Sequence, residues 1–152
     1  YSRFDGSLDV YHALQNYFAS YREGKRAVKG IVHGDPVFTN ILLQDSKILF
    51  IDMRGKQGTD CTIVGDVNYD LAKVYQSIIG YDFVLHNKDC NKSYQDKMID
   101  IFTKAVDDED RMREIKVITA SLFFSLIPLH DNEYCDRYYN LAKIILKGVG
   151  LI

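Results

Sequence analysis

The sequence predicts a single α+β domain that is mostly helical and carries one small β-hairpin. Three observations favour this fold class: apolar residues recur at helical spacing over most of the chain, two short apolar runs flank a turn near residue 45, and capping residues precede the periodic segments. A chain of 152 residues can bury roughly 68–70% of the surface that it exposes when unfolded. We therefore expect one domain over residues 1–152 with one hydrophobic core.

The first expected element is a helix that begins at Ser7, a favourable N-cap residue, and ends at Gly24. Its apolar residues recur at helical spacing; they are Leu8, Tyr11, Leu14, Phe18 and Tyr21. A basic connector follows over residues 25–29, and Ile31 with Val32 is expected to form a short buried strand.

The hairpin is expected where the apolar runs 41–43 and 48–51 flank the polar residues 44–47. The second run is short and continuously apolar, which is typical of a buried strand. Residues 53–64 contain two glycines and several polar residues, so they are expected to form a loop.

Helices dominate the second half of the predicted fold. Asp66 or Asn68 is expected to cap a helix that runs to about Ile79, and residues 80–91 look irregular. Three further helices are expected near 93–106, 108–126 and 133–147, with the acidic residues 107–110 at a helix N-terminus, where the helix dipole favours negative charge. Pro128 is expected to end the second of these three helices.

Composition restricts the partners and the compartment. The 19 basic and 21 acidic residues leave a net charge of −2, so nothing in the charge favours a nucleic-acid or anionic-membrane partner. The three cysteines form no Cys-x-x-Cys pair, which favours free thiols and a cytoplasmic location. No apolar run approaches the ~20 residues that span a bilayer. His12, His86 and His130 share no metal-ligand spacing.

The polar residues His33, Asp35 and Asn40 lie between two apolar runs, and Asp52 ends the next predicted strand. Phosphoryl transfer from ATP needs a carboxylate that orients the attacking hydroxyl and accepts its proton, and oxygen ligands that hold magnesium on the phosphates. A His-x-Asp-x-x-x-x-Asn loop followed by a metal-binding Asp provides this set in protein kinases.

Residues 31–43 resemble the catalytic loop of the aminoglycoside phosphotransferase and choline kinase-like family, whose members share the protein-kinase fold. The resemblance implies that Asp35 is the catalytic Asp, that Asn40 and Asp52 bind Mg²⁺, and that His33 has a structural role. Pro36 after the catalytic Asp departs from the family pattern.

The segment Gly65-Asp-Val-Asn-Tyr-Asp-Leu-Ala72 is similar to the family signature Gly-Asp-Pro-x-x-Asp-Leu-Ala. In that signature the second Asp, here Asp70, opens a helix and supports the catalytic loop. Val67 replaces the usual proline. The close resemblance covers about residues 31–71.

The resemblance implies an ATP- and Mg²⁺-dependent phosphotransferase that acts on the hydroxyl of a sugar, an amino alcohol or an aminoglycoside. It also implies that the chain is the C-terminal lobe of a kinase-like fold, with the hairpin carrying the catalytic loop. The residues before His33 predict one helix and contain no glycine-rich phosphate loop with a strand-borne lysine. We therefore expect an N-terminal lobe or neighbouring domain as a partner, an inactive isolated chain, and an unusually apolar surface where that partner would lie.

Several alternatives stay open. Gly-Asp-Pro is a common turn sequence, so Asp35 alone could be a turn residue, and Asn40 could be a local cap. The spacing of Asp35, Asn40 and Asp52 together favours catalysis. Tyr134, Tyr138 and Tyr139 are expected in the core, although an acceptor-binding role is an alternative; for Asp131 and Glu133 a solvated loop is favoured over an acceptor site. The competing functional class is a non-catalytic kinase-like interaction module.

Overall fold

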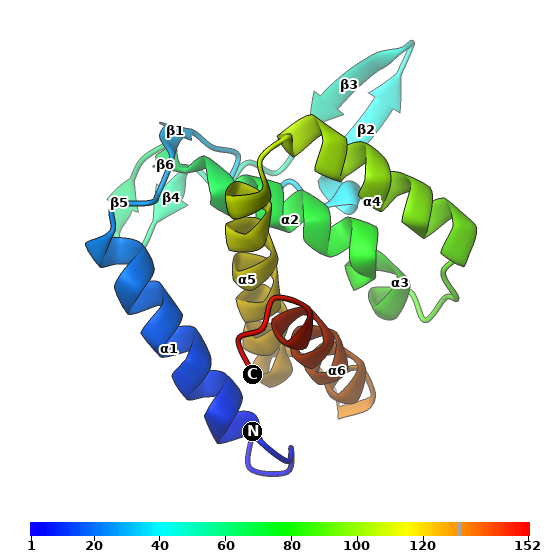
Figure 1. The fold of residues 1–152 in the computed structure, drawn as a ribbon. Coiled ribbons are helices and arrows are strands. Elements are labelled where there is room, and N and C mark those ends of the chain that lie inside the picture. Colours follow the sequence, from blue (N-terminus) through cyan, green and yellow to red (C-terminus); the bar gives the residue numbers. More distant parts are fainter. Residues whose placement is uncertain (131) are drawn as a thin grey trace.

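The computed structural model describes residues 1–130 and 132–152, without the side chains of residues 57, 132 and 133. The α-helices of this part are α1 (Ser7–Glu23), α2 (Val67–Ile79), α3 (Tyr81–Leu85), α4 (Lys92–Val106), α5 (Glu109–Leu126) and α6 (Asn132–Gly148) (Figure 1). Its strands are β1 (Lys29–Ile31), β2 (Ile41–Gln44), β3 (Lys47–Phe50), β4 (Lys56–Gln57), β5 (Asp60–Cys61) and β6 (Val64–Asp66). Two 3₁₀ turns, η1 (Phe38–Asn40) and η2 (Ile127–Leu129), complete the order. The predicted α+β class, mostly helical, is confirmed.

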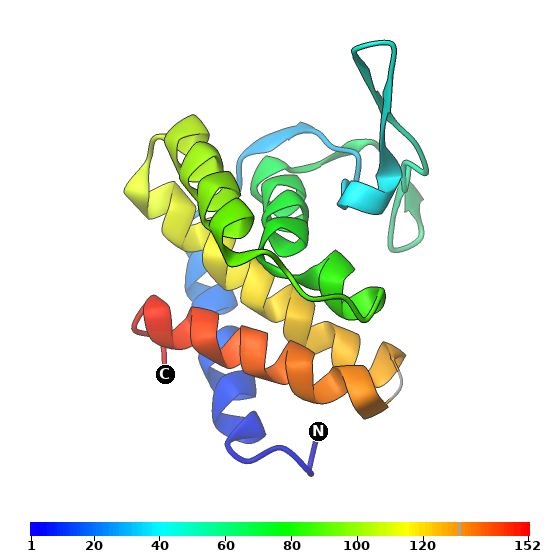
Figure 2. The ribbon, with the colours of Figure 1, turned by 90° about the vertical axis from the view of Figure 1, so that its right-hand side faces the viewer.

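The core is built around α5, which packs against both α2 and α6 (Figure 2). Ala72 of α2 and Ala120 of α5 are completely buried, and such small side chains allow two helices to approach closely. At this contact the Thr119 hydroxyl donates a hydrogen bond to the Ala72 carbonyl (3.1 Å). Burial of Ile115, Phe123 and Tyr138 then fills the space between α5 and its neighbours.

A buried polar network joins α1 to the start of α2 and to α5. Asn68 is fully buried; its amide donates to the Tyr21 hydroxyl (3.1 Å) and to Glu114 (3.2 Å), and its oxygen accepts from Arg111 (2.8 Å). The Tyr21 hydroxyl donates to Asp66 (2.8 Å). Because the members of the network satisfy one another, the network fixes α2 relative to both other helices.

Three two-stranded antiparallel sheets, β1–β6, β2–β3 and β4–β5, lie outside the helical core. The β1–β6 pair joins the chain just before residue 33 to the chain just before α2, with Gly30 opposite Gly65. A Cβ atom at Gly30 would lie 2.6 Å from the Val67 side chain, and one at Gly65 would lie 2.9 Å from the Val32 side chain. Glycine at both positions therefore allows this close crossing.

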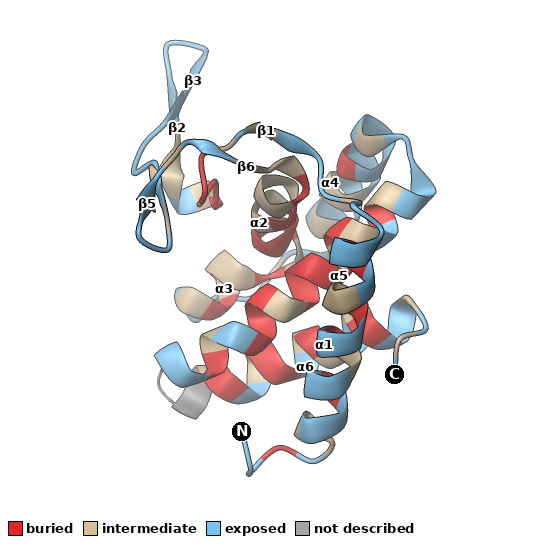
Figure 3. Cartoon of the chain, turned by 90° about the vertical axis from the view of Figure 1, so that its left-hand side faces the viewer, coloured by how far each residue is buried: buried red, intermediate tan, exposed pale blue. Residues whose placement is uncertain are grey.

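The hairpin forms where it was predicted, with Ile41 paired to Phe50, but the prediction of a buried second strand is wrong. Ile48 is 65% exposed and Phe50 is 57% exposed, because the hairpin projects away from the helices (Figure 3). We define the apolar hairpin surface as Leu42, Leu43, Ile48, Leu49, Phe50, Ile51 and Met53, all exposed. The hairpin therefore exposes several apolar side chains to solvent.

Other expectations need correction. The strand near Ile31 is not buried, since Ile31 is 75% exposed. The N-cap of α1 is Gly6, in a left-handed conformation (φ 74°), rather than Ser7. Residues 80–91 contain the short helix α3, and the loop 53–64 contains the β4–β5 pair.

The boundaries of the later helices agree with the sequence. The Asp66 side chain caps α2 by accepting from the Asn68 amide (3.0 Å), and the turn η2 that contains Pro128 follows α5. Of the acidic run, Asp107 ends α4 and Asp108 caps α5 by accepting from the Arg111 amide (2.8 Å). No helix in the described residues has the length and apolarity needed to cross a membrane.

Candidate active site

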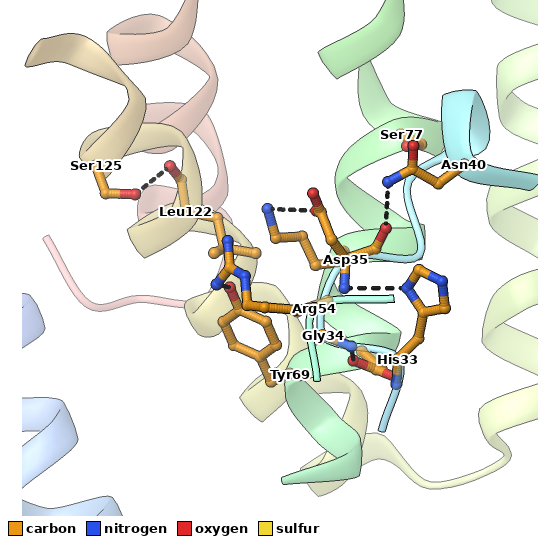
Figure 4. A network of polar contacts seen from close by, with 12 residues as sticks. His33, Gly34, Asp35, Asn40, Arg54, Tyr69, Ser77, Leu122 and Ser125 are labelled. Atoms are coloured by element: carbon orange, nitrogen blue, oxygen red, sulfur yellow. Dashed lines mark hydrogen bonds and ion pairs between the residues drawn. The ribbon is translucent and has the colours of Figure 1, made fainter. Parts of the chain in front are cut away.

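The loop between β1 and β2 is anchored by the carboxylate of Asp70, in the first turn of α2. The backbone amides of His33 and Gly34 donate to the two Asp70 oxygens, at 2.6 Å and 2.9 Å (Figure 4). Hydrogen bonds to an ionised acceptor are roughly twice as strong as neutral ones, and a carboxylate is favoured near a helix N-terminus. Asp70 therefore holds the start of the loop against α2.

The far end of the loop is bonded to the same face of α2 two turns later. The Phe38 amide donates to the Ser77 hydroxyl (3.0 Å), and Ser77 lies seven residues after Asp70. Within the loop, the Asn40 side-chain amide donates to the Asp35 carbonyl (2.9 Å) (Figure 4). The backbone of Asp35 is thus fixed by contacts on both sides of it.

His33 is buried and positions the backbone at Asp35. Its Nδ1 accepts from the Asp35 amide (3.3 Å), and its ring centroid lies 5.7 Å from that of Phe50. Its Nε2 has no hydrogen-bond partner among the described residues. Through Nδ1 and its ring, His33 thus contacts the loop backbone and the hairpin.

The Asp35 carboxylate forms an ion pair with Lys73 of α2, a residue that sequence reasoning missed. Asp35 Oδ1 lies 3.0 Å from Lys73 Nζ, and the two side chains are 31% and 12% exposed. Oδ1 itself is buried, so the exposed part of the Asp35 side chain includes other atoms. The available sequence signal was the position of Lys73 three residues after Asp70, which places both on one helix face.

Tyr81, at the start of α3, is partly buried and lies within electrostatic reach of Asp35. Burial raises the pKa of Tyr81, and the negative charges of Asp35 and Asp82 raise it further. Burial also raises the pKa of Asp82, which favours its neutral form. The surroundings of Asp35 therefore include a lysine and a phenol.

Asp52 lies two residues after the end of β3 and next to the backbone pairing with Asn40. The Ile51 amide donates to the Asn40 carbonyl (3.0 Å), so Asp52 is the first residue after that bond. Asp52 is exposed and adopts a left-handed conformation (φ 60°), which is uncommon outside glycine and is enriched at functional sites. Its carboxylate accepts no hydrogen bond within the described part of the chain.

No group of three or more His, Cys, Asp and Glu residues that could hold a metal ion occurs in the described residues. Asn40 and Asp52 are one amide and one carboxylate, so they are not such a group. Mg²⁺ is usually held by only one or two protein ligands, and water and substrate phosphates complete its coordination.

A cavity of about 750 Å³ lies next to the loop, lined by residues that include His33, Gly34, Arg54, Tyr69 and Thr62. Arg54 donates to the Tyr69 hydroxyl (3.5 Å), and a Cβ atom at Gly34 would lie 2.8 Å from the Arg54 Cβ. Asp35 does not line this cavity.

The other candidate residues lie apart from this loop. Tyr138 and Tyr139 are buried in the core, against which Tyr134 packs. Asp131 and the side chain of Glu133 lie outside the described residues.

Comparison of the chain with protein-family models, with curated proteins and with solved structures gave no significant match.

Proposed function

We propose that the chain is the catalytic lobe of an ATP-dependent phosphotransferase that transfers a phosphoryl group to the hydroxyl of a small molecule. The observation that carries the proposal is the loop of residues 33–40, which Asp70 and Ser77 hold against α2 with its aspartate partly exposed. Catalysis of phosphoryl transfer depends mainly on positioning and electrostatics, and a loop fixed at several points supplies positioning.

The donor atoms of Asn40 and Asp52 suit magnesium. The Asn40 amide nitrogen is used in the bond to the Asp35 carbonyl, so its side-chain oxygen is left for another partner. The exposed Asp52 carboxylate contributes a second hard oxygen ligand. When bound between these two residues and the ATP phosphates, Mg²⁺ would neutralise negative charge on the phosphates.

In the proposed reaction, the acceptor hydroxyl donates a hydrogen bond to the free oxygen of Asp35, Oδ2. Asp35 takes the proton as the new bond forms between the hydroxyl oxygen and the γ-phosphorus. The bond from the γ-phosphorus to the bridging oxygen breaks, and ADP leaves. Lys73 stays ion-paired with Oδ1 throughout the reaction, and this pairing fixes the orientation of the Asp35 carboxylate.

The test is phosphoryl transfer from radiolabelled MgATP to a panel of sugars, amino alcohols and aminoglycosides by the complete protein. Asp35→Asn keeps the shape of the side chain but removes the proton acceptor, so we expect turnover to fall by about a hundredfold or more. Asp45→Asn, the same substitution in the exposed turn of the hairpin, is the control and should keep full activity. Near-normal turnover by Asp35→Asn would remove Asp35 as the base.

A second candidate function is a non-catalytic kinase-like interaction module, which the apolar hairpin surface favours. A contiguous exposed apolar surface is typical of a site that contacts another protein. This candidate predicts no transfer to any acceptor and no effect of Asp35→Asn on binding through the hairpin.

A further inference from the structure

The charge next to Asp35 restricts the acceptor in a way that the loop sequence does not reveal. Lys73 Nζ lies 3.0 Å from Asp35 Oδ1, and with a side chain only 12% exposed it has little freedom to turn into solvent. The negative charge of Asp35 is therefore already matched by a cation that belongs to the protein.

A second cation, Arg54, lies close to the same loop. Its side chain packs against Gly34, the residue before Asp35, with Cβ, Cγ and Cδ all within 4 Å of the position of a Cβ atom at residue 34 (Figure 4). The Asp70 carboxylate is occupied by two backbone amides, and burial raises the pKa of Asp82. Asp52 is exposed, but in the proposed function its carboxylate is a ligand of Mg²⁺. The Asp82 oxygens are buried, so neither carboxylate is open to a positively charged acceptor.

A cationic acceptor would bring its ammonium groups towards Lys73 as its hydroxyl approached Asp35. Like charges a few ångströms apart repel even in a partly hydrated site, and at such a distance the repulsion lowers affinity by about tenfold or more. A neutral or anionic hydroxyl compound meets no such repulsion.

We propose that Lys73 makes the acceptor site selective for sugars and sugar derivatives without positive charge, and excludes amino alcohols and aminoglycosides. The Tyr81 hydroxyl, which is within electrostatic reach of Asp35, is a neutral hydrogen-bonding group of the kind that binds sugar hydroxyls. This inference rests on the proposed function and adds the substrate class to it.

The test measures kcat/KM of the complete protein with MgATP for two sets of probes. The uncharged or anionic set is glucose, mannose, fucose and glucuronate; the cationic set is choline, ethanolamine and kanamycin. We expect transfer by the wild type only to members of the first set. Lys73→Gln should raise kcat/KM for the cationic set relative to the sugars by about tenfold, whereas Lys73→Arg should keep the wild-type selectivity.

Lys104→Gln is the matched control, because Lys104 also pairs with an aspartate, Asp100, at 2.7 Å but lies on the exposed face of α4. It should leave the selectivity unchanged. If Lys73→Gln fails to fold, as judged by circular dichroism, the wild type and Lys73→Arg still decide the question.

Different results contradict the charge-selection inference and the proposed function. Transfer by the wild type to choline or kanamycin as efficient as transfer to the sugars would overturn the charge-selection inference and leave the proposed function standing. An unchanged ratio in a folded Lys73→Gln protein would overturn it as well. If no acceptor is phosphorylated and release of phosphate from MgATP is the same in the wild type and Asp35→Asn, the proposed function itself fails, and the inference with it.

Discussion

Asp70 controls the position of the loop that carries Asp35, because both of its oxygens accept backbone amides from that loop. The contact is fixed on one side by the first turn of α2 and on the other by the short pairing of β1 with β6. A single side chain thus connects the helical core to the candidate active site.

Replacing Asp70 by Asn tests this connection. The side-chain NH₂ group of the asparagine faces one of the two backbone amides, those of His33 and Gly34. Two donors then meet, so one charge-assisted hydrogen bond is lost, and the other weakens because its acceptor is no longer charged. We expect a loss of about 1.5–3 kcal/mol in the free energy of unfolding. Hydrogen exchange at the His33 and Gly34 amides should become faster than in the wild type.

The control is Asp100→Asn, which removes an exposed ion pair on α4 and should cost less than about 1 kcal/mol. Unchanged exchange at His33 and Gly34 in Asp70→Asn would show that other contacts hold the loop.

At the residue scale, the sequence located Asp35, Asn40, Asp52 and Asp70 because their spacing along the chain is short and resembles a known loop. It did not reveal Lys73, since an ion pair between α2 and the loop depends on how the two segments pack. The roles of Asp35, Asn40 and Asp52 remain predictions.

At the scale of elements, helix positions were predictable from apolar spacing and capping residues. The boundaries of α2 and α5 depend on local signals, such as the Asp66 and Asp108 caps. The β1–β6 pair was not predicted, because three-residue strands that contain glycine show no alternation of apolar and polar residues. The burial of the hairpin was predicted wrongly, because an apolar strand is buried only if another segment covers it.

The hairpin offers a prediction of its own. Leu43 and Ile48 are paired across β2 and β3 and are 77% and 65% exposed, so the double variant Leu43→Lys, Ile48→Lys should change the free energy of unfolding by less than about 1 kcal/mol. It should also reduce self-association of the chain at high concentration, measured by analytical ultracentrifugation, because the apolar hairpin surface becomes charged.

Val10→Lys and Leu14→Lys in α1 are the contrasting variants, since both residues are buried and the substitutions should unfold the chain. A large loss of stability in the hairpin variant would mean that the hairpin packs against the rest of the protein in solution.

At the scale of the whole molecule, a rigid helical core supports a loop and hairpin that lie outside it (Figure 1). The core fixes α2, α2 fixes the loop through Asp70, Lys73 and Ser77, and the loop presents Asp35. The hairpin that follows brings the backbone of Asp52 beside Asn40. In this arrangement the proposed metal ligands depend on the hairpin, whereas the proposed base depends on α2.

The most direct test of the central claim, a divalent-cation site at Asn40 and Asp52 beside Asp35, is paramagnetic broadening by Mn²⁺ in the presence of ATP. We expect Mn²⁺ to broaden the NMR signals of the Asn40 side-chain amide and the Asp35 and Asp52 backbone amides first, at concentrations that leave the amides of α6 sharp. Asp52→Ala should abolish this selective broadening while the rest of the spectrum is unchanged. Broadening centred elsewhere, or selective broadening that persists in Asp52→Ala, would contradict the account.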